Sequence, residues 1–177
     1  MPRRSYSFAG ILETLRRYRV RFVLVGGVAA VVEGAPVSTF NVDIVPARRA
    51  DNIERLLTAL RELDAYYRTR PELRRRPARD ALTGDGHHLL MTRYGPLDVL
   101  GVVGRGRDFD ALLNHSTRRK LGNAYIHVLD IEAQIAVKEE VGHEKDRMVL
   151  PVLREVLRFQ QERRRRGPRK TGARTKK

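Results

Sequence analysis

The sequence contains no cysteine and no tryptophan among its 177 residues, and aromatic residues make up only 6% of it. The absence of cysteine excludes disulfide bonds, thiolate zinc sites and cysteine nucleophiles, and it is typical of a reducing compartment. Any catalysis must therefore use carboxylates, histidine, lysine or hydroxyl groups. Because aromatics are scarce while apolar residues still account for 41% of the chain, we expect a mainly aliphatic core.

Long hydrophobic runs are also missing. No stretch approaches the roughly 18 consecutive apolar residues that a membrane span requires. Arg3 and Arg4 are not followed by the apolar segment of a secretion signal. We therefore expect a cytoplasmic protein with no membrane partner. A chain of this length is typical of one domain around one core.

Negative charge is scarce, since the formal net charge is +15. Residues 163–177 hold nine Lys or Arg and no acid, so we predict a domain over residues 1–162 followed by a basic, disordered tail. Residues 68–79 form a second basic block that contains six Arg. Such segments bind nucleic acid by releasing condensed counterions, or they are solvated surfaces that keep a protein soluble. We favour nucleic acid as the partner.

The hydrophobic pattern alternates between helical and strand periods, which predicts a mixed α/β (α+β) fold. It predicts a small mixed sheet flanked by helices, with a C-terminal helical segment. Asp51 is a candidate helix N-cap, Gly95-Pro96 a candidate hairpin turn, and Pro151 a candidate kink or first turn. The expected helices are 8–18, 28–32, 51–63, 108–114 and 130–161 with a break near Gly142, and the expected strands are 21–25, 39–45, 89–94, 97–103 and, at a sheet edge, 124–129.

Polar residues on two of the predicted strands carry the chemistry. Asn41 and Asp43 are two residues apart, so their side chains share one face of a strand. Asp98 interrupts an apolar run, where a carboxylate is costly unless it is paired or bound to a metal. If the two strands are neighbours, Asp98 faces Asp43 and their oxygens suit Mg²⁺. Alternatively, backbone amides or an arginine satisfy both acids.

Gly26 and Gly27 follow a predicted buried strand and precede a predicted helix, so we expect a tight turn there. Glycine leaves the backbone N–H groups unhindered, and the start of a helix favours a phosphate. The pair is weak evidence alone. Its position before the strand that carries Asp43, and before the hairpin that carries Asp98, makes the combination more specific.

Together these motifs resemble the nucleotidyltransferases of the DNA polymerase β superfold, especially the AbiE-type and tRNA-modifying toxins of toxin–antitoxin systems. The resemblance covers roughly residues 20–160. It implies an enzyme that uses Mg²⁺ or Mn²⁺ to move a nucleoside monophosphate from a nucleoside triphosphate (NTP) to RNA. The implied acceptor is the 3′ end of tRNA, and a cognate antitoxin is a further implied partner. The residues that carry it are 23–27, 39–45, 97–100, Lys138, Lys145 and Asp146.

The resemblance also assigns roles to these residues. It places Asn41, Asp43 and Asp98 at the metal, and Lys138 and Asp146 with them among the catalytic residues. Lys138 would neutralise the charge of the phosphates; alternatively, it is a solvated residue on an amphipathic helix. Asp146 would complete the site or assist deprotonation of the acceptor. The nucleotide would be bound by Gly26, Gly27, Thr39, Lys138 and Lys145.

His87, His88 and His143 are further candidates for a metal ligand or a phosphate contact. His87 and His88 are adjacent on a predicted strand and point to opposite faces, so we do not expect a metal site there. His143 occupies a position where relatives often carry arginine, which favours a phosphate contact.

Asn41 departs from the family pattern, which has aspartate there. Asparagine brings no negative charge, so we expect weaker metal binding and strongly reduced transfer. The substitution is either a deliberate inactivation of a growth-inhibiting enzyme or a natural variant that binds without turnover. Two other functions stay open. One is transfer of AMP to a protein, although the enzymes that do this usually have Gly-Ser where this chain has Gly26-Gly27. The other is a non-catalytic nucleic-acid-binding module on a degenerate nucleotidyltransferase fold.

Overall fold

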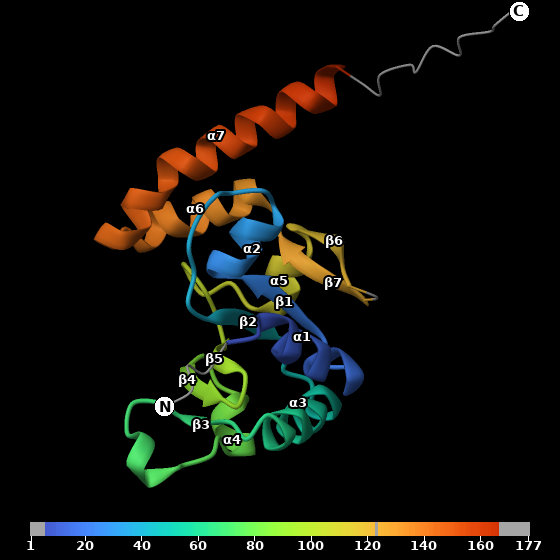
Figure 1. Ribbon diagram of the computed structural model, residues 1–177, viewed down its shortest axis with the longest axis vertical. Helices are drawn as coiled ribbons and strands as arrows, with labels where there is room; N and C mark the ends of the chain where they lie inside the picture. Colours follow the sequence, from blue (N-terminus) through green and yellow to red (C-terminus); the bar gives the residue numbers. More distant parts are fainter. Residues whose placement is uncertain (1–5, 123, 167–177) are drawn as a thin grey trace, which may run out of the picture.

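The computed structural model describes residues 6–122 and 124–166, and its centre is a seven-stranded mixed sheet (Figure 1). The strand order is β3-β4-β5-β2-β1-β7-β6. β1 pairs with β7 and β2 with β5 in parallel, and the other neighbours are antiparallel. The strands are β1 (Phe22–Val25), β2 (Val42–Pro46), β3 (Tyr66–Tyr67), β4 (His87–Thr92), β5 (Gly95–Leu100), β6 (Ser116–Leu121) and β7 (Ala124–Leu129).

Helices cover both faces of this sheet. Figure 1 shows α6 and α7 beyond one end of it and α3 and α4 near the other. None of the helices within the described residues is both long and apolar enough to cross a membrane. The helices are α1 (Phe8–Arg17), α2 (Gly26–Val32), α3 (Ala50–Glu62), α4 (Arg79–Leu82), α5 (Phe109–Leu113), α6 (Ile131–Val141) and α7 (Glu144–Arg166), with a 3₁₀ turn at Pro71–Leu73.

β1 is an inner strand of the sheet, and all four of its residues are apolar and buried. Its side chains alternate between two clusters, as the strand period requires. Phe22 and Leu24 pack with apolar residues of α1 and α3, whereas Val23 and Val25 pack with α5 on the other face. Full burial of such a side chain contributes about 1.5–3 kcal/mol. β1 therefore anchors the sheet from both sides.

The C-terminal helices form a pair that packs on α2. Gly142 ends α6 in the left-handed conformation that glycine adopts readily, at φ 65°, and α7 begins two residues later. Pro151 lies inside α7, where it removes one backbone donor. Ala30, Ile135 and Leu153 share a small core between the three helices. α7 continues to Arg166, past the predicted domain end at residue 162, and residues 167–177 of the predicted tail lie outside the described residues.

The mixed fold with a C-terminal helical segment is confirmed, but several local predictions are wrong. Asp51 lies in the first turn of α3, and Arg49 is the N-cap. The hairpin turn is Arg93-Tyr94, because Thr92 pairs with Gly95 and Gly95-Pro96 begins β5. No separate turn precedes α2, which starts at Gly26 directly after β1.

The predicted position of the 124–129 strand is also wrong. β7 lies between β1 and β6, so it is an inner strand, and β6 forms the edge. β6 was not predicted because its residues are mainly polar and either half-buried or exposed, so it lacks the alternation of apolar residues that marks a strand in the sequence. The two-residue strand β3 is too short to leave a periodic signal.

Candidate active site

Asp43 and Asp98 meet because β2 and β5 are parallel neighbours. The two residues are direct register partners in this strand pair. Asp43 is also the register partner of Val25, the last residue of β1, so both acids lie at the end of β1 where α2 begins. The predicted convergence of these two carboxylates is therefore observed.

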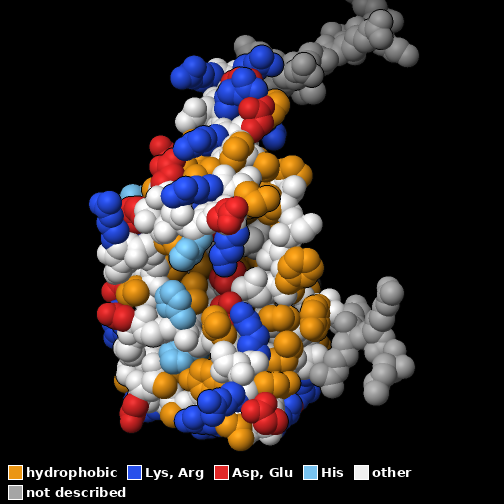
Figure 2. Space-filling view, turned by 90° about the vertical axis from the view of Figure 1, so that its left-hand side faces the viewer, with side chains coloured by type: hydrophobic (Ala, Val, Ile, Leu, Met, Phe, Trp, Pro, Cys, Tyr) orange, Lys and Arg blue, Asp and Glu red, His pale blue; other side chains and the backbone are white. Residues whose placement is uncertain are grey.

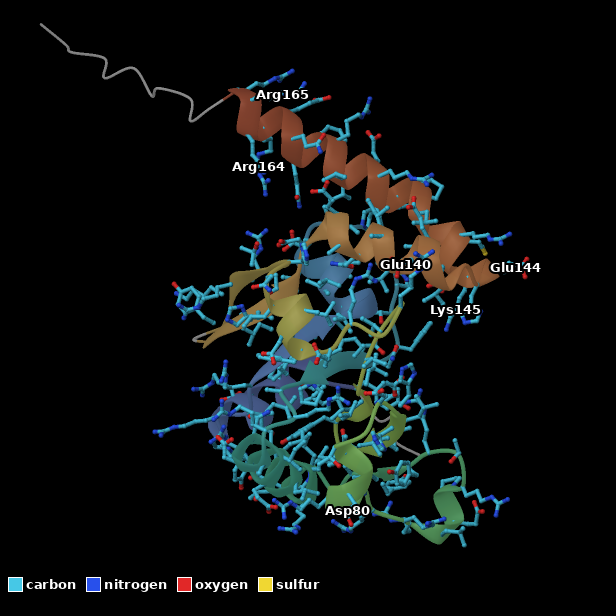
Figure 3. The ribbon with its side chains drawn as sticks, turned by 180° about the vertical axis from the view of Figure 1, so that it is seen from behind. Asp80, Glu140, Glu144, Lys145, Arg164 and Arg165 are labelled. Carbon is cyan, nitrogen blue, oxygen red and sulfur yellow. The ribbon has the colours of Figure 1, made fainter. Side chains whose placement is uncertain are left out.

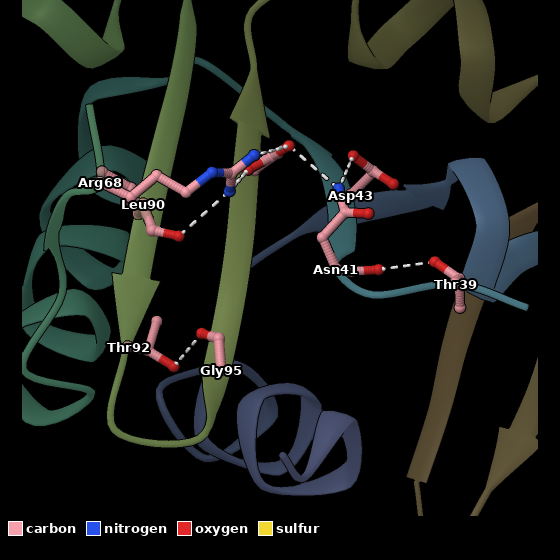
Figure 4. Close-up of polar contacts among 8 residues, drawn as sticks. Thr39, Asn41, Asp43, Arg68, Leu90, Thr92 and Gly95 are labelled. Atoms are coloured by element: carbon pink, nitrogen blue, oxygen red, sulfur yellow. Dashed lines mark hydrogen bonds and ion pairs between the residues drawn. The ribbon is translucent and has the colours of Figure 1, made fainter. Parts of the chain in front are cut away.

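Asn41 joins the two acids. It lies just before β2 rather than within it, and its side-chain Nδ2 donates hydrogen bonds to Asp43 Oδ1 at 2.7 Å and to Asp98 Oδ2 at 3.0 Å (Figure 4). The hydroxyl of Thr39 donates to the backbone carbonyl of Asn41 at 3.2 Å. The amide thus occupies the space between the carboxylates, where an aspartate could not donate to them.

Arg68 supplies a cation that sequence reasoning did not place in the site. Its guanidinium pairs with both carboxylate oxygens of Asp98, with an Nη2–Oδ2 distance of 3.0 Å (Figure 4). It also donates to the carbonyl of Leu90 at 3.3 Å. Asp98 is only 6% exposed, so this charge pair compensates its burial. The sequence signal for such a cation was Asp98 itself, because an acid within an apolar run requires a partner.

The electrostatics of the two acids differ because Arg68 pairs with only one of them. Burial and the negative charge of Asp98 raise the pKa of Asp43 to about 7. The hydrogen bond from Asn41 and the charges of Arg68 and Lys138 oppose this shift without cancelling it. Near neutral pH Asp43 therefore exists in both protonation states.

Both glycines allow close approach of the polar residues around them. Gly26 has φ of 69°, and a Cβ there would overlap the carboxylate of Asp43. A Cβ on Gly27 would lie 2.5 Å from Oγ1 of Thr39. The pair is thus needed for packing beside Asp43 and Thr39, whatever else it binds.

Lys138 and Asp146 form a second polar pair beside the acids. Lys138 Nζ lies 2.7 Å from Asp146 Oδ1, and both side chains are largely buried. The effect of the Lys138 charge on the pKa of Asp43 places the lysine on the same side of the molecule. Lys145 is exposed at the start of α7, close to Glu144 and to the end of α6 at Glu140 (Figure 3).

The donor set suits one divalent cation rather than two. Within the part of the chain that the structure describes, no three His, Cys, Asp or Glu side chains are placed to share a metal ion. Two carboxylates beside an amide suit a single Mg²⁺, which prefers few carboxylates together with water and phosphate oxygens.

The basic block at residues 68–79 carries less free charge than its composition suggests. Arg68 pairs with Asp98, while Arg74 and Arg76 share Asp64 and Arg79 pairs with Glu54. Figure 2 shows Lys and Arg side chains spread over one face of the molecule, including the C-terminal end of α7 at the top. Positive charge is therefore distributed rather than confined to this block.

Among the described residues, His87, His88 and His143 form no hydrogen bond with Asp43 or Asp98. His88 is buried, and its Nδ1 lies 2.8 Å from the hydroxyl of Tyr67. His87 is exposed on the same strand, and its Nε2 lies 3.0 Å from the carbonyl of Val102. His143 is exposed in the connection between α6 and α7.

No protein-family model matches the sequence, and no curated protein is significantly similar to it. Solved structures are similar. TM1012 from Thermotoga maritima, a candidate nucleotidyltransferase, has a TM-score of 0.50 at 14% identity, over 92% of this chain and 100% of its own. The lincosamide antibiotic adenylyltransferase LnuA, with lincomycin bound, has a TM-score of 0.57 at 15% identity, over 86% of this chain and 99% of its own. At such low identity the likeness concerns architecture alone: this chain has the nucleotidyltransferase fold.

Proposed function

We propose that this chain is a nucleotidyltransferase that moves a nucleoside monophosphate from an NTP to a hydroxyl group of RNA, weakened by Asn41. One observation carries the proposal. Asp43 and Asp98 are register partners on neighbouring parallel strands, at the end of β1, in a chain with the nucleotidyltransferase fold. Two adjacent acids, one buried and one half-buried, are costly and favour a cation beside them.

The residues around the pair have distinct tasks in this proposal. Asp43 and Asp98 would hold one Mg²⁺ or Mn²⁺, which neutralises charge on the triphosphate when it is bound. Lys138 would contact phosphate oxygens, and Asp146 keeps its ammonium group in place at 2.7 Å. Gly26 and Gly27 would offer backbone N–H groups to the triphosphate at the start of α2, and Thr39 and Lys145 would complete the nucleotide contacts.

Asn41 explains why transfer would be slow. Its amide already satisfies one oxygen of each carboxylate, so a cation must displace two hydrogen bonds before it binds both acids. Arg68 adds a second competitor, because it holds both oxygens of Asp98. With an aspartate at position 41 the site would gain a third carboxylate and lose the competing donor.

The RNA acceptor is supported by the charge of the chain and by the motifs described above. A net charge of +15 favours a polyanionic substrate. The resemblance to tRNA-modifying toxins favours the 3′ end of tRNA and a cognate antitoxin. Transfer of AMP to a protein is the alternative acceptor chemistry. Because LnuA is a lincosamide antibiotic adenylyltransferase, a small-molecule acceptor such as lincomycin is also tested.

A second candidate function is a nucleotide-binding or RNA-binding module without catalysis. Its support is specific: Asn41 and Arg68 satisfy Asp98 fully and Asp43 in part, without any metal ion. In that case the polar cluster would stabilise the fold and the chain would bind nucleic acid through its arginines.

A transfer assay separates the two candidates. Each labelled NTP is incubated with Mg²⁺ and total tRNA, with the chain as it stands and with Asn41→Asp. Label on RNA with Asn41→Asp, and its loss when Asp98→Asn is added to that variant, would establish the transferase. Parallel reactions with a protein mixture or lincomycin in place of tRNA identify another acceptor. No label in any reaction, with tRNA still bound, would leave the binding module.

A further inference from the structure

A groove lies at the opposite end of β1 from the acids. It is bounded by the end of α1, the start of β1, α5 and β7, and it has a volume of about 290 Å³. Its lining includes the side chains of Arg16, Arg19, Arg21, Phe109, Tyr125 and His127, together with four further apolar residues.

The positive charge of this groove is not neutralised within the described residues. Arg16, Arg19 and Arg21 are exposed and form no ion pair there, and no acid lines the groove. Arg118 extends the charge, because it is the register partner of His127 across β6 and β7. In contrast, four of the six arginines in the 68–79 block are paired with acids. The groove therefore suits an anionic ligand better than that block does.

Aromatic rings hold two of the arginines at the rim. The guanidinium of Arg21 lies 5.4 Å from the ring centre of Phe109, and that of Arg118 lies 5.1 Å from the ring centre of Tyr125. Phe109 is buried, whereas Tyr125 is 59% exposed. Exposed aromatic rings among arginines favour stacked bases together with phosphates, which an acidic peptide would not use.

The end of α1 places Arg19 at the groove. Arg19 has φ of 53°, in the left-handed position that often follows a helix. The N–H of Val20 bonds to the carbonyl of Leu15 at 3.0 Å and that of Arg19 to the carbonyl of Arg16 at 2.8 Å, so the helix end itself fixes this backbone. Asp64 adopts the same conformation after α3. Arg19 lines the groove together with Arg16 and Arg21.

We propose that this groove is a docking site for single-stranded RNA, bound through its phosphates by Arg16, Arg19 and Arg21 and through one base stacked on Tyr125. The site is separate from the acids, since Phe22 at the near end of β1 and Val25 beside Asp43 are about 10 Å apart along the strand. The RNA class of ligand rests on the proposed function, but binding at the groove needs neither NTP nor metal.

Fluorescence anisotropy with a labelled oligouridylate of about 12 nucleotides tests the proposal, without NTP and with EDTA present. The affinity is measured over a range of salt concentrations for the full chain. Replacing Arg16, Arg19 and Arg21 together by Gln should weaken binding by more than about tenfold and reduce the salt slope by about 2, at about 0.7 for each lost phosphate contact. Tyr125→Leu should weaken binding by about tenfold with an unchanged slope, and Tyr125→Phe should retain it.

A matched control removes the same charge elsewhere. Arg70, Arg75 and Arg93 are also exposed and free of ion pairs among the described residues, so their joint replacement by Gln should change the slope far less. An equal loss in control and groove variants, or no loss with the groove variant, would overturn the proposal. The proposal would also be overturned if polyglutamate displaced the labelled oligouridylate as strongly as unlabelled RNA does, and if the groove substitutions weakened its binding equally. Failure of the transfer assay leaves these outcomes unchanged, because no transfer is measured here.

Discussion

Asp43 and Asp98 face one another at the same level of β2 and β5, but only Asp98 is paired with an arginine. The pair is therefore asymmetric: one acid has a bidentate cationic partner, and the other depends on an amide and on more distant charges. The stability and the metal affinity of the chain should both respond to this asymmetry.

The raised pKa of Asp43 predicts a stability that falls as the pH rises. The folded chain retains the proton of Asp43 up to about pH 7, whereas the unfolded chain loses it near the ordinary value of 3.8. The folded state therefore binds more protons between about pH 4 and pH 7, so stability is lost through that window and stays low above it. Asp43→Asn lacks this titration and should be more stable than the unmodified chain above pH 7, by roughly 1–2 kcal/mol after allowance for solvent screening.

Thermal unfolding of both chains from pH 4 to pH 9 measures this effect. The difference between them should shrink toward pH 4. Glu54→Gln, which alters an exposed acid paired with Arg79, serves as the control and should follow the unmodified chain. A difference between Asp43→Asn and the unmodified chain that stays constant across the pH range would contradict the prediction.

Arg68→Ala should destabilise the chain by roughly 2–4 kcal/mol, because it leaves a buried carboxylate at Asp98 without its cation. Mg²⁺ should recover part of this loss and should bind more tightly than in the unmodified chain, since the guanidinium no longer competes for Asp98. Denaturant unfolding with and without Mg²⁺, together with calorimetric titration, provides both readouts. Arg70→Ala, an exposed arginine from the same block, should change neither quantity by much.

Asn41→Asp should lower the free energy of unfolding by about 1–3 kcal/mol in EDTA, because three carboxylates then meet without the amide that links two of them. Mg²⁺ should raise the stability of this variant far more than that of the unmodified chain, since it binds only the folded form. Asn41→Ala loses the same hydrogen bonds without adding charge, so Mg²⁺ should not rescue it to the same extent. Equal Mg²⁺ responses from all three chains would argue against a cation at these acids.

Glu33→Gln should loosen the contact between α7 and the rest of the domain. The Glu33 carboxylate receives two hydrogen bonds from Arg119 and one from Gln160, and its side chain is only 1% exposed. Loss of its charge should cost about 2–4 kcal/mol and should speed amide hydrogen exchange in the C-terminal half of α7. Glu155→Gln breaks only an exposed pair with Arg158 and should leave exchange in the C-terminal half of α7 nearly unchanged.

The sequence supports the prediction of those elements whose pattern is local. Gly142 marks the end of α6, because glycine adopts the left-handed conformation there. The convergence of Asp43 and Asp98 was predicted only on the condition that their strands are neighbours, which strand alternation alone does not establish and the observed pairing of β2 with β5 provides. The mixed fold and its C-terminal helices were predictable from such local patterns.

Contacts between distant segments were not predictable in this way. Arg68 is one of six arginines in the block at residues 68–79, and no local pattern distinguishes the one that reaches Asp98 from the others. β6 is polar because one of its edges faces solvent, so its composition resembles that of a loop. The roles of Lys145 and Thr39 toward a nucleotide stay predictions, and the groove at Tyr125 depends on four elements that only the fold brings together.

The length of α7 has a mechanical consequence. Asp146 near its start holds Lys138 beside the acids, and Gln160, about 20 Å further along the helix, donates to the backbone and side chain of Glu33 at the end of α2. α2 begins beside Asp43 and ends at this second contact. The C-terminal helix thus links the residue that ends α2 to the lysine whose charge acts on Asp43, so we expect that shortening the chain before Gln160 would alter the site from a distance.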